Sequence, residues 1–269
     1  MPQVAVIMSV YKNDKLLYLK EALDSLYAQT MQADIFIQQD GEIPKELEDF
    51  LDKELFKNKI VYLGKRNENI GLAGSLNELL AIVLLDYNYI VRMDADDISV
   101  ETRIEKQVGF LEQHLNIQAL GGWIEEFNMD SGEIQVVRYG ENYEQIKLNL
   151  VKRNPLAHVT VCFRNSFFDT IPTYNIEKLN EDFDLWIRAL KKDVKLYNLQ
   201  EVLVKVRTNN EFFARRKNWK RAVEVMELKL NASRTFGFGI KGYFYAVTHF
   251  ILFMSPSWFK SYVYKNLRG

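Results

Sequence analysis

Short apolar runs alternate with amphipathic stretches over the first 100 residues of the chain. The runs are rich in β-branched side chains, which is typical of buried strands. They cover residues 4–10, 35–39, 60–63 and 89–93. Between the first two runs, leucines at positions 16, 19, 23 and 26 recur at helical spacing, and similar patterns predict helices over residues 44–56 and 72–85.

This alternation predicts an α/β fold, in which helices cover both faces of a mostly parallel sheet. Ligands bind such sheets outside the carboxyl ends of the strands. Polar residues follow the predicted strands at these ends: Ser9, Tyr11, Asp40, Gly41, Arg66, Asn67, Asp94, Asp96 and Asp97.

Beyond residue 97 the patterns predict further helices and strands. The helices cover residues 100–114, 141–151 and 181–191, and the strands cover residues 118–121, 134–138 and 158–163. Neither an internal repeat nor a low-complexity linker divides the first 200 residues. We therefore predict one α/β domain over residues 1–210 and a helical region, basic and rich in aromatic residues, over residues 211–269.

The charge of the chain is unevenly distributed. Its net charge is −1, from 35 Lys and Arg against 36 Asp and Glu, which excludes the strong basic excess of a nucleic-acid-binding protein. Residues 201–269, however, hold 13 basic and 4 acidic residues, against 22 and 32 in residues 1–200. This asymmetry predicts that the C-terminal end meets an anionic surface or ligand.

Several features predict a cytoplasmic protein. The N-terminus enters an apolar run without the basic segment and cleavage site of a secretory signal. Cys162 is the single cysteine and is expected to be buried in the core, so disulfides are excluded. The longest apolar stretch, residues 243–254, is shorter than the roughly 20 residues that span a bilayer.

Three carboxylates in four residues follow the strand at residues 89–93. Asp94, Asp96 and Asp97 would repel one another in a dry site, and a divalent cation such as Mg²⁺ or Mn²⁺ would neutralise them. The alternative is a solvated acidic turn in which Asp97 caps the next helix.

Two other segments carry candidate chemistry. Glu181 and Asp182 precede an amphipathic helix, where one carboxylate can serve as a general base or merely cap the helix. The segment 69–77 resembles a glycine-rich phosphate loop but lacks the lysine of a P-loop. Its small residues alternatively allow a close approach of helix, strand and ligand.

Taken in order, these motifs resemble the family 2 glycosyltransferases, inverting enzymes of the Rossmann-like GT-A fold that use nucleotide-sugar donors. The resemblance rests on residues 4–11, 39–41, 69–77, 94–97 and 181–182 and spans residues 3–210. Residues 153–164 are similar to those of the AmsE-like subgroup, which makes surface polysaccharides. The resemblance implies that the protein transfers a hexose or N-acetylhexosamine, most simply from a UDP-sugar, to a lipid-diphosphate-linked saccharide.

The resemblance also implies roles for individual residues. Ser9, Tyr11 and Asp40 would surround the base, with Tyr11 stacking on it and Asp40 accepting a hydrogen bond from uracil. The nucleotide and sugar side would be lined by Asn69, Gly71 and Asn77, and Arg92 would approach the donor sugar or diphosphate. Asp94 and Asp96 would form the Asp-X-Asp motif and hold Mn²⁺ or Mg²⁺. Asp182 would be the general base, with Glu181 orienting the acceptor or the sugar.

Some residues keep two interpretations. His158 either contacts the acceptor or diphosphate or is a structural histidine. Arg207, Arg215 and Arg216 either bind a diphosphate or form a solvated basic surface.

The region 236–264 mixes many aromatic residues with lysines, which suits the interface of an anionic membrane. A helical hairpin packed on the core or on a partner subunit is the alternative. Membrane contact would place the enzyme at the inner face of the cell membrane. Two other functions remain open: a noncatalytic nucleotide-sugar or polysaccharide-binding module, and a sugar nucleotidylyltransferase.

Overall fold

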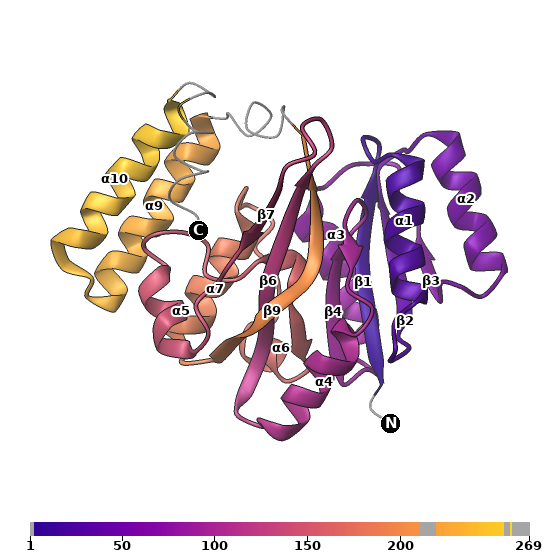
Figure 1. Ribbon diagram of the computed structural model, residues 1–269, viewed down its shortest axis with the longest axis horizontal. Helices are drawn as coiled ribbons and strands as arrows, with labels where there is room; N and C mark the ends of the chain where they lie inside the picture. The colour runs from indigo at the N-terminus through magenta and orange to yellow at the C-terminus, as the bar shows by residue number, and fades with distance from the viewer. Residues whose placement is uncertain (1–2, 210–218, 256–258, 260–269) are drawn as a thin grey trace.

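A computed structural model describes residues 3–209, 219–255 and 259. Helices lie on both sides of a twisted sheet, and a helical hairpin lies at one end of the molecule (Figure 1). The strands are β1 (Val4–Tyr11), β2 (Asp34–Asp40), β3 (Tyr62–Gly64), β4 (Tyr89–Asp94), β5 (Ile98–Ser99), β6 (Ile117–Asn128), β7 (Ile134–Val137), β8 (Cys162–Arg164) and β9 (Lys195–Thr208). The helices are α1 (Leu16–Tyr27), α2 (Lys45–Phe56), α3 (Leu72–Val83), α4 (Arg103–Gln113), α5 (Tyr143–Asn149), a 3₁₀ turn (His158–Thr160), α6 (Phe167–Thr170), α7 (Glu181–Lys191), α9 (Trp219–Phe236) and α10 (Gly239–Met254).

Within the described residues, the strands form one sheet in the order β3-β2-β1-β4-β8-β6-β9-β5, with β7 on β6. The pairings among β3, β2, β1 and β4 are parallel, as predicted. Beyond β4 the sheet is mixed: β8 is antiparallel to both β4 and β6, whereas β6 and β9 run parallel. The α/β fold is confirmed, and the predicted parallel arrangement describes its N-terminal half.

Two hydrophobic cores, one on each face, explain why β1 is apolar throughout. Val6 and Met8 belong to the core shared with α1, α2 and α4, whereas Ala5 and Ile7 belong to the core shared with α3 and α7. Successive side chains of a strand point to opposite faces, so a strand covered on both sides carries no polar alternation. The free cysteine, Cys162, is buried in the first core, as expected.

Two predictions about strands were wrong. The segment predicted as a strand over residues 158–163 begins as a 3₁₀ turn, because the Thr160 amide and hydroxyl both donate to the Ala157 carbonyl and compete with sheet pairing. The prediction also gave no strand after residue 163. Residues Lys195–Thr208 nevertheless form the long strand β9, whose valines at 202, 204 and 206 alternate as strand residues do.

The C-terminal helices form a tightly packed hairpin (Figure 1). Gly242 of α10 faces Ser233 of α9 so closely that an added Cβ would lie 2.3 Å from the serine Oγ. Gly237 in the turn between the helices and Gly239 at the start of α10 are both at positive φ. The inner face of α9 is buried, so the predicted helical region packs on the α/β domain through this helix.

Candidate active site

A cleft of about 420 Å³ opens at the carboxyl ends of the parallel strands. The register places Tyr11 of β1 beside Asp40 of β2. It also places Ser9 of β1 beside Asp94 of β4. The cleft is lined by Ser9, Tyr11, Asp14, Asp40, Asn69, Gly71, Leu72, Asp94, Ala95, Asp96, Asp97, Val206 and Arg207. Most of the residues predicted to bind the donor and the metal therefore meet in one place.

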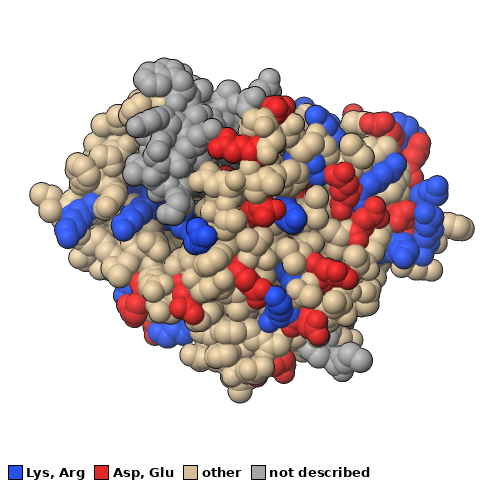
Figure 2. Space-filling model, viewed as in Figure 1, with Lys and Arg blue, Asp and Glu red and all other residues tan. Residues whose placement is uncertain are grey.

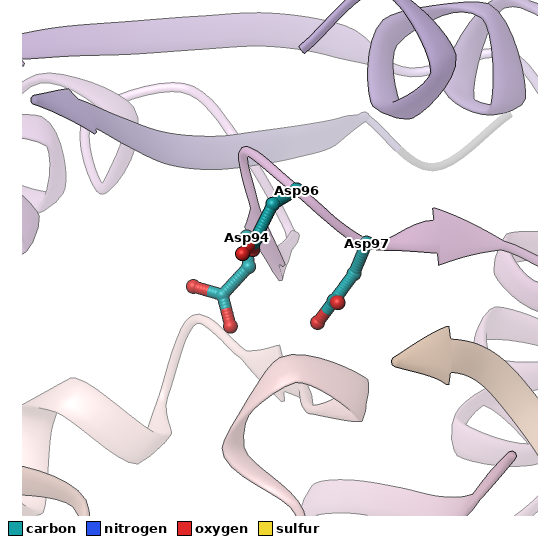
Figure 3. A group of neighbouring side chains, drawn as sticks. All are labelled: Asp94, Asp96 and Asp97. Carbon is teal, nitrogen blue, oxygen red and sulfur yellow. The ribbon is translucent and has the colours of Figure 1, made fainter. Parts of the chain in front are cut away.

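The carboxylates of Asp94, Asp96 and Asp97 form a compact group between β4 and β5 (Figure 3). One oxygen of each lies within 4.8 Å of the others. The neighbouring strand β9 contributes Arg207, whose backbone amide donates to the Asp97 carboxylate at 2.9 Å and whose Nε donates to the Asp96 carbonyl at 3.0 Å. Asp97 is buried, whereas Asp96 is exposed and Asp94 is half-buried.

The negative charge in this group is incompletely balanced by the chain. Loss of water contact within the cleft, with repulsion from Asp94, raises the pKa of Asp96 to about 6, although part of this side chain is exposed. Burial, with repulsion from Asp96, raises the pKa of Asp97 well above its ordinary value. Across the cleft, burial raises the pKa of Asp14 to about 7. A group of oxygen ligands with excess negative charge fits a divalent cation such as Mg²⁺ or Mn²⁺.

Asp40 organises the opposite wall of the cleft. Its buried carboxylate pairs with the Arg66 guanidinium and accepts hydrogen bonds from Asn69 Nδ2 at 3.0 Å and from the amides of Ile70 at 2.9 Å and Gly71 at 3.0 Å. A carboxylate offers about four acceptor positions, and these four donors occupy them. Asp40 therefore holds the loop before α3, and it also lines the cleft, so its predicted bond to uracil stays a prediction.

The segment 69–77 is a tight turn into α3 and not a phosphate loop of the P-loop kind. Gly71 precedes the helix at a φ of 86° and a ψ of 169°, a conformation accessible to glycine. Asn77 lies outside the cleft: its side chain donates to the Tyr174 carbonyl and accepts from the Tyr174 amide. Both polar groups of Asn77 thus hold a backbone segment, and its predicted place on the nucleotide and sugar side stays a prediction.

Arg92 lies between the acidic cluster and a second acidic pair. It is buried and pairs with Asp94, while its Nε and Nη1 have no hydrogen-bond partner among the described residues. Burial raises the pKa values of Asp96, Asp97, Glu181 and Asp182, and the charge of Arg92 partly offsets this rise in each of them. One buried guanidinium is thus shared by the two acidic groups that the sequence singled out.

Glu181 and Asp182 form the first turn of α7. Asp182 accepts a hydrogen bond from the Phe183 amide at 2.7 Å and another from the Asn154 side chain. These bonds favour the ionised form of Asp182, although burial raises its pKa. Burial and repulsion from Asp182 raise the pKa of Glu181 to about 7. Asp182 therefore caps the helix in part, as the alternative interpretation held, and is also a half-buried carboxylate near Arg92.

His158 is buried behind this pair. Its Nε2 lies 2.8 Å from the Tyr174 hydroxyl, and its ring packs edge-on against Trp186. Burial, followed by the charge of Arg92, lowers the pKa of His158 well below its ordinary value, so the ring is neutral at pH 7. These contacts support the structural interpretation of His158.

Sequence reasoning missed three side chains that the structure places at the site. Asp14 lies in the polar turn after β1 and could have been found by its position at a strand end. Asn154 and Tyr174 carry no comparable signal, because only the tertiary contacts bring them to Asp182 and His158. The predicted contacts Arg215 and Arg216 lie outside the described residues.

A model of the family described as glycosyl transferase family 2 matches residues 5–175. This match spans the β1 turn, the Asp40 wall, the acidic cluster and the Asn154 loop. The chain belongs to glycosyl transferase family 2. The predicted family and enzyme class, a glycosyltransferase, are therefore confirmed.

The amylovoran biosynthesis glycosyltransferase AmsE of Erwinia amylovora is 30% identical to this glycosyltransferase, over 98% of each chain. The Escherichia coli enzyme UDP-Gal:alpha-D-GlcNAc-diphosphoundecaprenol beta-1,3-galactosyltransferase is 28% identical, over 99% of this chain and 96% of that one. The solved structure of the mannosyltransferase PcManGT from Pyrobaculum calidifontis matches with a TM-score of 0.69 at 14% identity, over 98% of this chain and 76% of that one. The relatives confirm the predicted surface-polysaccharide subgroup, and the structure confirms the GT-A fold.

The Asp40 wall yields a prediction about stability. Asp40→Ala leaves two amides without their acceptor and removes the buried partner of Arg66, which keeps only its more exposed pair with Glu78 and its bonds to Ser75 and Glu68. We expect the free energy of unfolding to fall by about 3–5 kcal/mol. Asp52→Ala is the control, because its pair with Lys65 is exposed and such pairs contribute below about 1 kcal/mol. Urea denaturation measures both, and equal losses would show that Asp40 does not hold this wall.

Proposed function

We propose that this glycosyltransferase is metal-dependent and inverting, and that it transfers a hexose or N-acetylhexosamine from a UDP-sugar to a saccharide on a lipid diphosphate. The observation that carries the proposal is the buried Arg92, which links a three-carboxylate cluster in the cleft to the carboxylate pair on α7. This arrangement provides one region for an anionic leaving group and another for a general base.

The names of the relatives support the substrates. The Escherichia coli relative is named for UDP-Gal as donor and for an acceptor on diphosphoundecaprenol. PcManGT was solved with GDP-Man and Mn²⁺. With 96% of the Escherichia coli enzyme aligned, a nucleotide-sugar donor and a lipid-diphosphate-linked acceptor are the simplest substrates for this chain.

On the donor side, we assign the metal to Asp94 and Asp96, with Asp96 as the more exposed ligand. When bound, Mn²⁺ or Mg²⁺ offsets the charge that develops on the leaving diphosphate. Tyr11 is exposed at the cleft and provides a ring on which the base can stack, beside Ser9. Arg207 lines the cleft next to the cluster, and its guanidinium, which pairs with Glu21, would contact the diphosphate by exchanging that partner.

On the acceptor side, Asp182 takes the proton of the attacking hydroxyl. Its hydrogen bonds from Asn154 and the Phe183 amide keep it ionised, while the neighbouring Glu181 retains a proton up to about pH 7 and can orient the acceptor. The acceptor oxygen forms its bond to the anomeric carbon as the bond to the diphosphate breaks. This single displacement inverts the anomeric centre, so an α-linked donor gives a β-glycoside.

The first test concerns the donor and the metal. UDP-, GDP- and dTDP-sugars are compared by thermal shift with and without Mn²⁺, and then by transfer to a lipid-diphosphate saccharide. We expect a Mn²⁺-dependent shift with UDP-sugars, which Asp96→Asn and Asp94→Asn each abolish because the metal loses a charged ligand. A response to no donor, or one that is independent of metal, would contradict the proposal.

The second test concerns the base and its pH dependence. Asp182→Asn is expected to lower kcat by about 10²–10⁴-fold, the usual contribution of general base catalysis. Because the pKa values of both carboxyl groups are raised, they release their protons at higher pH than free acids do. Turnover of the wild type should therefore fall in the acidic range as Asp182 takes up its proton, at a higher pH than for an aspartate in water.

The control for this test is Asp169→Asn, which changes an exposed carboxylate on α6 and should leave kcat unchanged. Wild-type turnover in the Asp182→Asn variant would refute the assignment of the base. Turnover that stays constant down to the pH at which a free aspartate takes up its proton would do the same.

We further propose that α10 contacts the inner face of the cell membrane. Its outer side exposes Ile240, Tyr243, Phe244, Val247 and Ile251, whose spacing forms one stripe along the helix. Figure 2 shows this end of the molecule as a mostly uncharged surface. In the described part of the chain, no helix has both the length and the apolar character to cross a bilayer.

An anionic bilayer fits this stripe, both by the charge of the C-terminal region and by the nature of the acceptor. Residues 201–269 hold 13 Lys and Arg against 4 Asp and Glu, which matches an anionic bilayer surface. An acceptor on a lipid diphosphate keeps the reaction beside that surface. The inner side of the hairpin packs on the core through α9. The interpretation as a packed hairpin therefore applies to α9, and the proposed membrane contact to α10.

The third test measures flotation with vesicles that contain about one third anionic lipid. The double variant Phe244→Glu/Ile251→Glu places charges in the stripe and should abolish flotation. Phe56→Glu/Leu85→Glu alters exposed apolar residues elsewhere and should float like the wild type. If the stripe variant floats normally, α10 is not the membrane contact.

A further inference from the structure

Helix α9 contacts the residues that directly precede the catalytic pair. The Glu224 carboxylate accepts hydrogen bonds from the Leu179 amide at 3.1 Å, the Asn180 amide at 2.9 Å and the Asn180 side chain at 3.0 Å. One turn away, Arg221 donates to the Leu179 carbonyl at 2.6 Å. Residues three apart lie on the same side of a helix, so α9 holds this peptide by both its amides and its carbonyl.

These bonds replace the usual cap of α7. Asn180 is the N-cap residue, a position at which an asparagine side chain normally accepts a hydrogen bond from an amide of the first turn. Here it makes no such bond and donates to Glu224 instead. The direction in which α7 begins, and with it the position of Glu181 and Asp182, is therefore fixed by a side chain from α9.

The same helix also holds the loop that contacts Asp182 from the other side. Lys229 is 1% exposed, and its ammonium group donates to the Val151 carbonyl at 2.6 Å. Three residues further on, Asn154 donates to the Asp182 carboxylate. The two segments that meet at Asp182, one on each side, are thus both attached to α9.

We propose that Arg221, Glu224 and Lys229, here called the α9 clamp, are positioning residues that hold Asp182 in its reactive geometry. The inference rests on the proposed role of Asp182 as the general base. It makes the C-terminal hairpin a working part of the active site, although none of the clamp residues lines the donor cleft.

The consequence is a separation between binding and turnover. The donor cleft is built from β1, β2, β4, β9 and the loop before α3, none of which the clamp residues contact through the bonds described above. A displacement of a reacting group by about 1 Å can cost as much as 10²-fold in rate. Loss of the clamp should therefore lower kcat while donor binding persists.

Glu224→Ala in the full chain tests this inference. We expect kcat to fall by about 10- to 100-fold, with KM for the UDP-sugar and Kd for UDP with Mn²⁺ changed less than about threefold. The matched control is Glu227→Ala, which removes an exposed carboxylate from the same helix and should leave kcat unchanged. Glu224→Gln keeps one oxygen that can accept both Asn180 bonds, so it should recover part of the turnover.

Three outcomes overturn the clamp. They are equal kcat values for Glu224→Ala and Glu227→Ala, no recovery in Glu224→Gln, and a loss of UDP binding that parallels the loss of kcat in both Glu224 variants. Asp182→Asn, assayed in parallel, separates this inference from the proposed function. If Asp182→Asn is inactive while Glu224→Ala is normal, the clamp alone is wrong. Normal turnover in Asp182→Asn refutes the base assignment itself, and the clamp with it.

Discussion

The concentration of negative charge at one edge of the sheet is the constraint on which this structure depends. The carboxyl ends of β1, β2 and β4 meet there because parallel strands align their ends, and each strand carries an aspartate at or shortly after its last residue. Carboxylates this close raise one another's pKa unless cations balance them. The extent to which cations and hydrogen-bond donors of the chain balance these carboxylates differs between the parts of the site.

At Asp40 the balance is complete within the chain. Arg66, Asn69 and two backbone amides satisfy the carboxylate, and the result is a rigid wall. At Asp94–Asp97 the balance is incomplete, since Arg92 and Arg207 supply fewer positive charges than the cluster requires. The first carboxylate therefore serves structure, whereas the cluster retains the capacity to bind a cation.

Arg92 joins this cluster to the carboxylates of α7. A buried guanidinium keeps its charge, and here it stabilises the ionised forms of two acidic groups on different elements. Around it, polar side chains hold backbone segments in place: Asn77 holds Tyr174, and Glu224 holds the start of α7. The C-terminal hairpin therefore takes part in the architecture that surrounds the site.

The sequence by itself determined the elements of the N-terminal half and the candidate residues of the site. Local patterns of apolar residues located the first four strands, and short acidic motifs at strand and helix ends located Asp94, Asp96 and Asp182, because both signals depend on neighbours in the chain. Only the tertiary structure decided which polar groups satisfy one another. Asp40 and Asn77 were predicted to line the donor site, and the structure adds that both hold backbone segments of the protein. Asn154 and Glu224 gain their importance from partners 28 and 44 residues away. The physical reason is that a hydrogen-bond partner or a desolvated charge depends on the folding of distant segments, which local spacing does not encode.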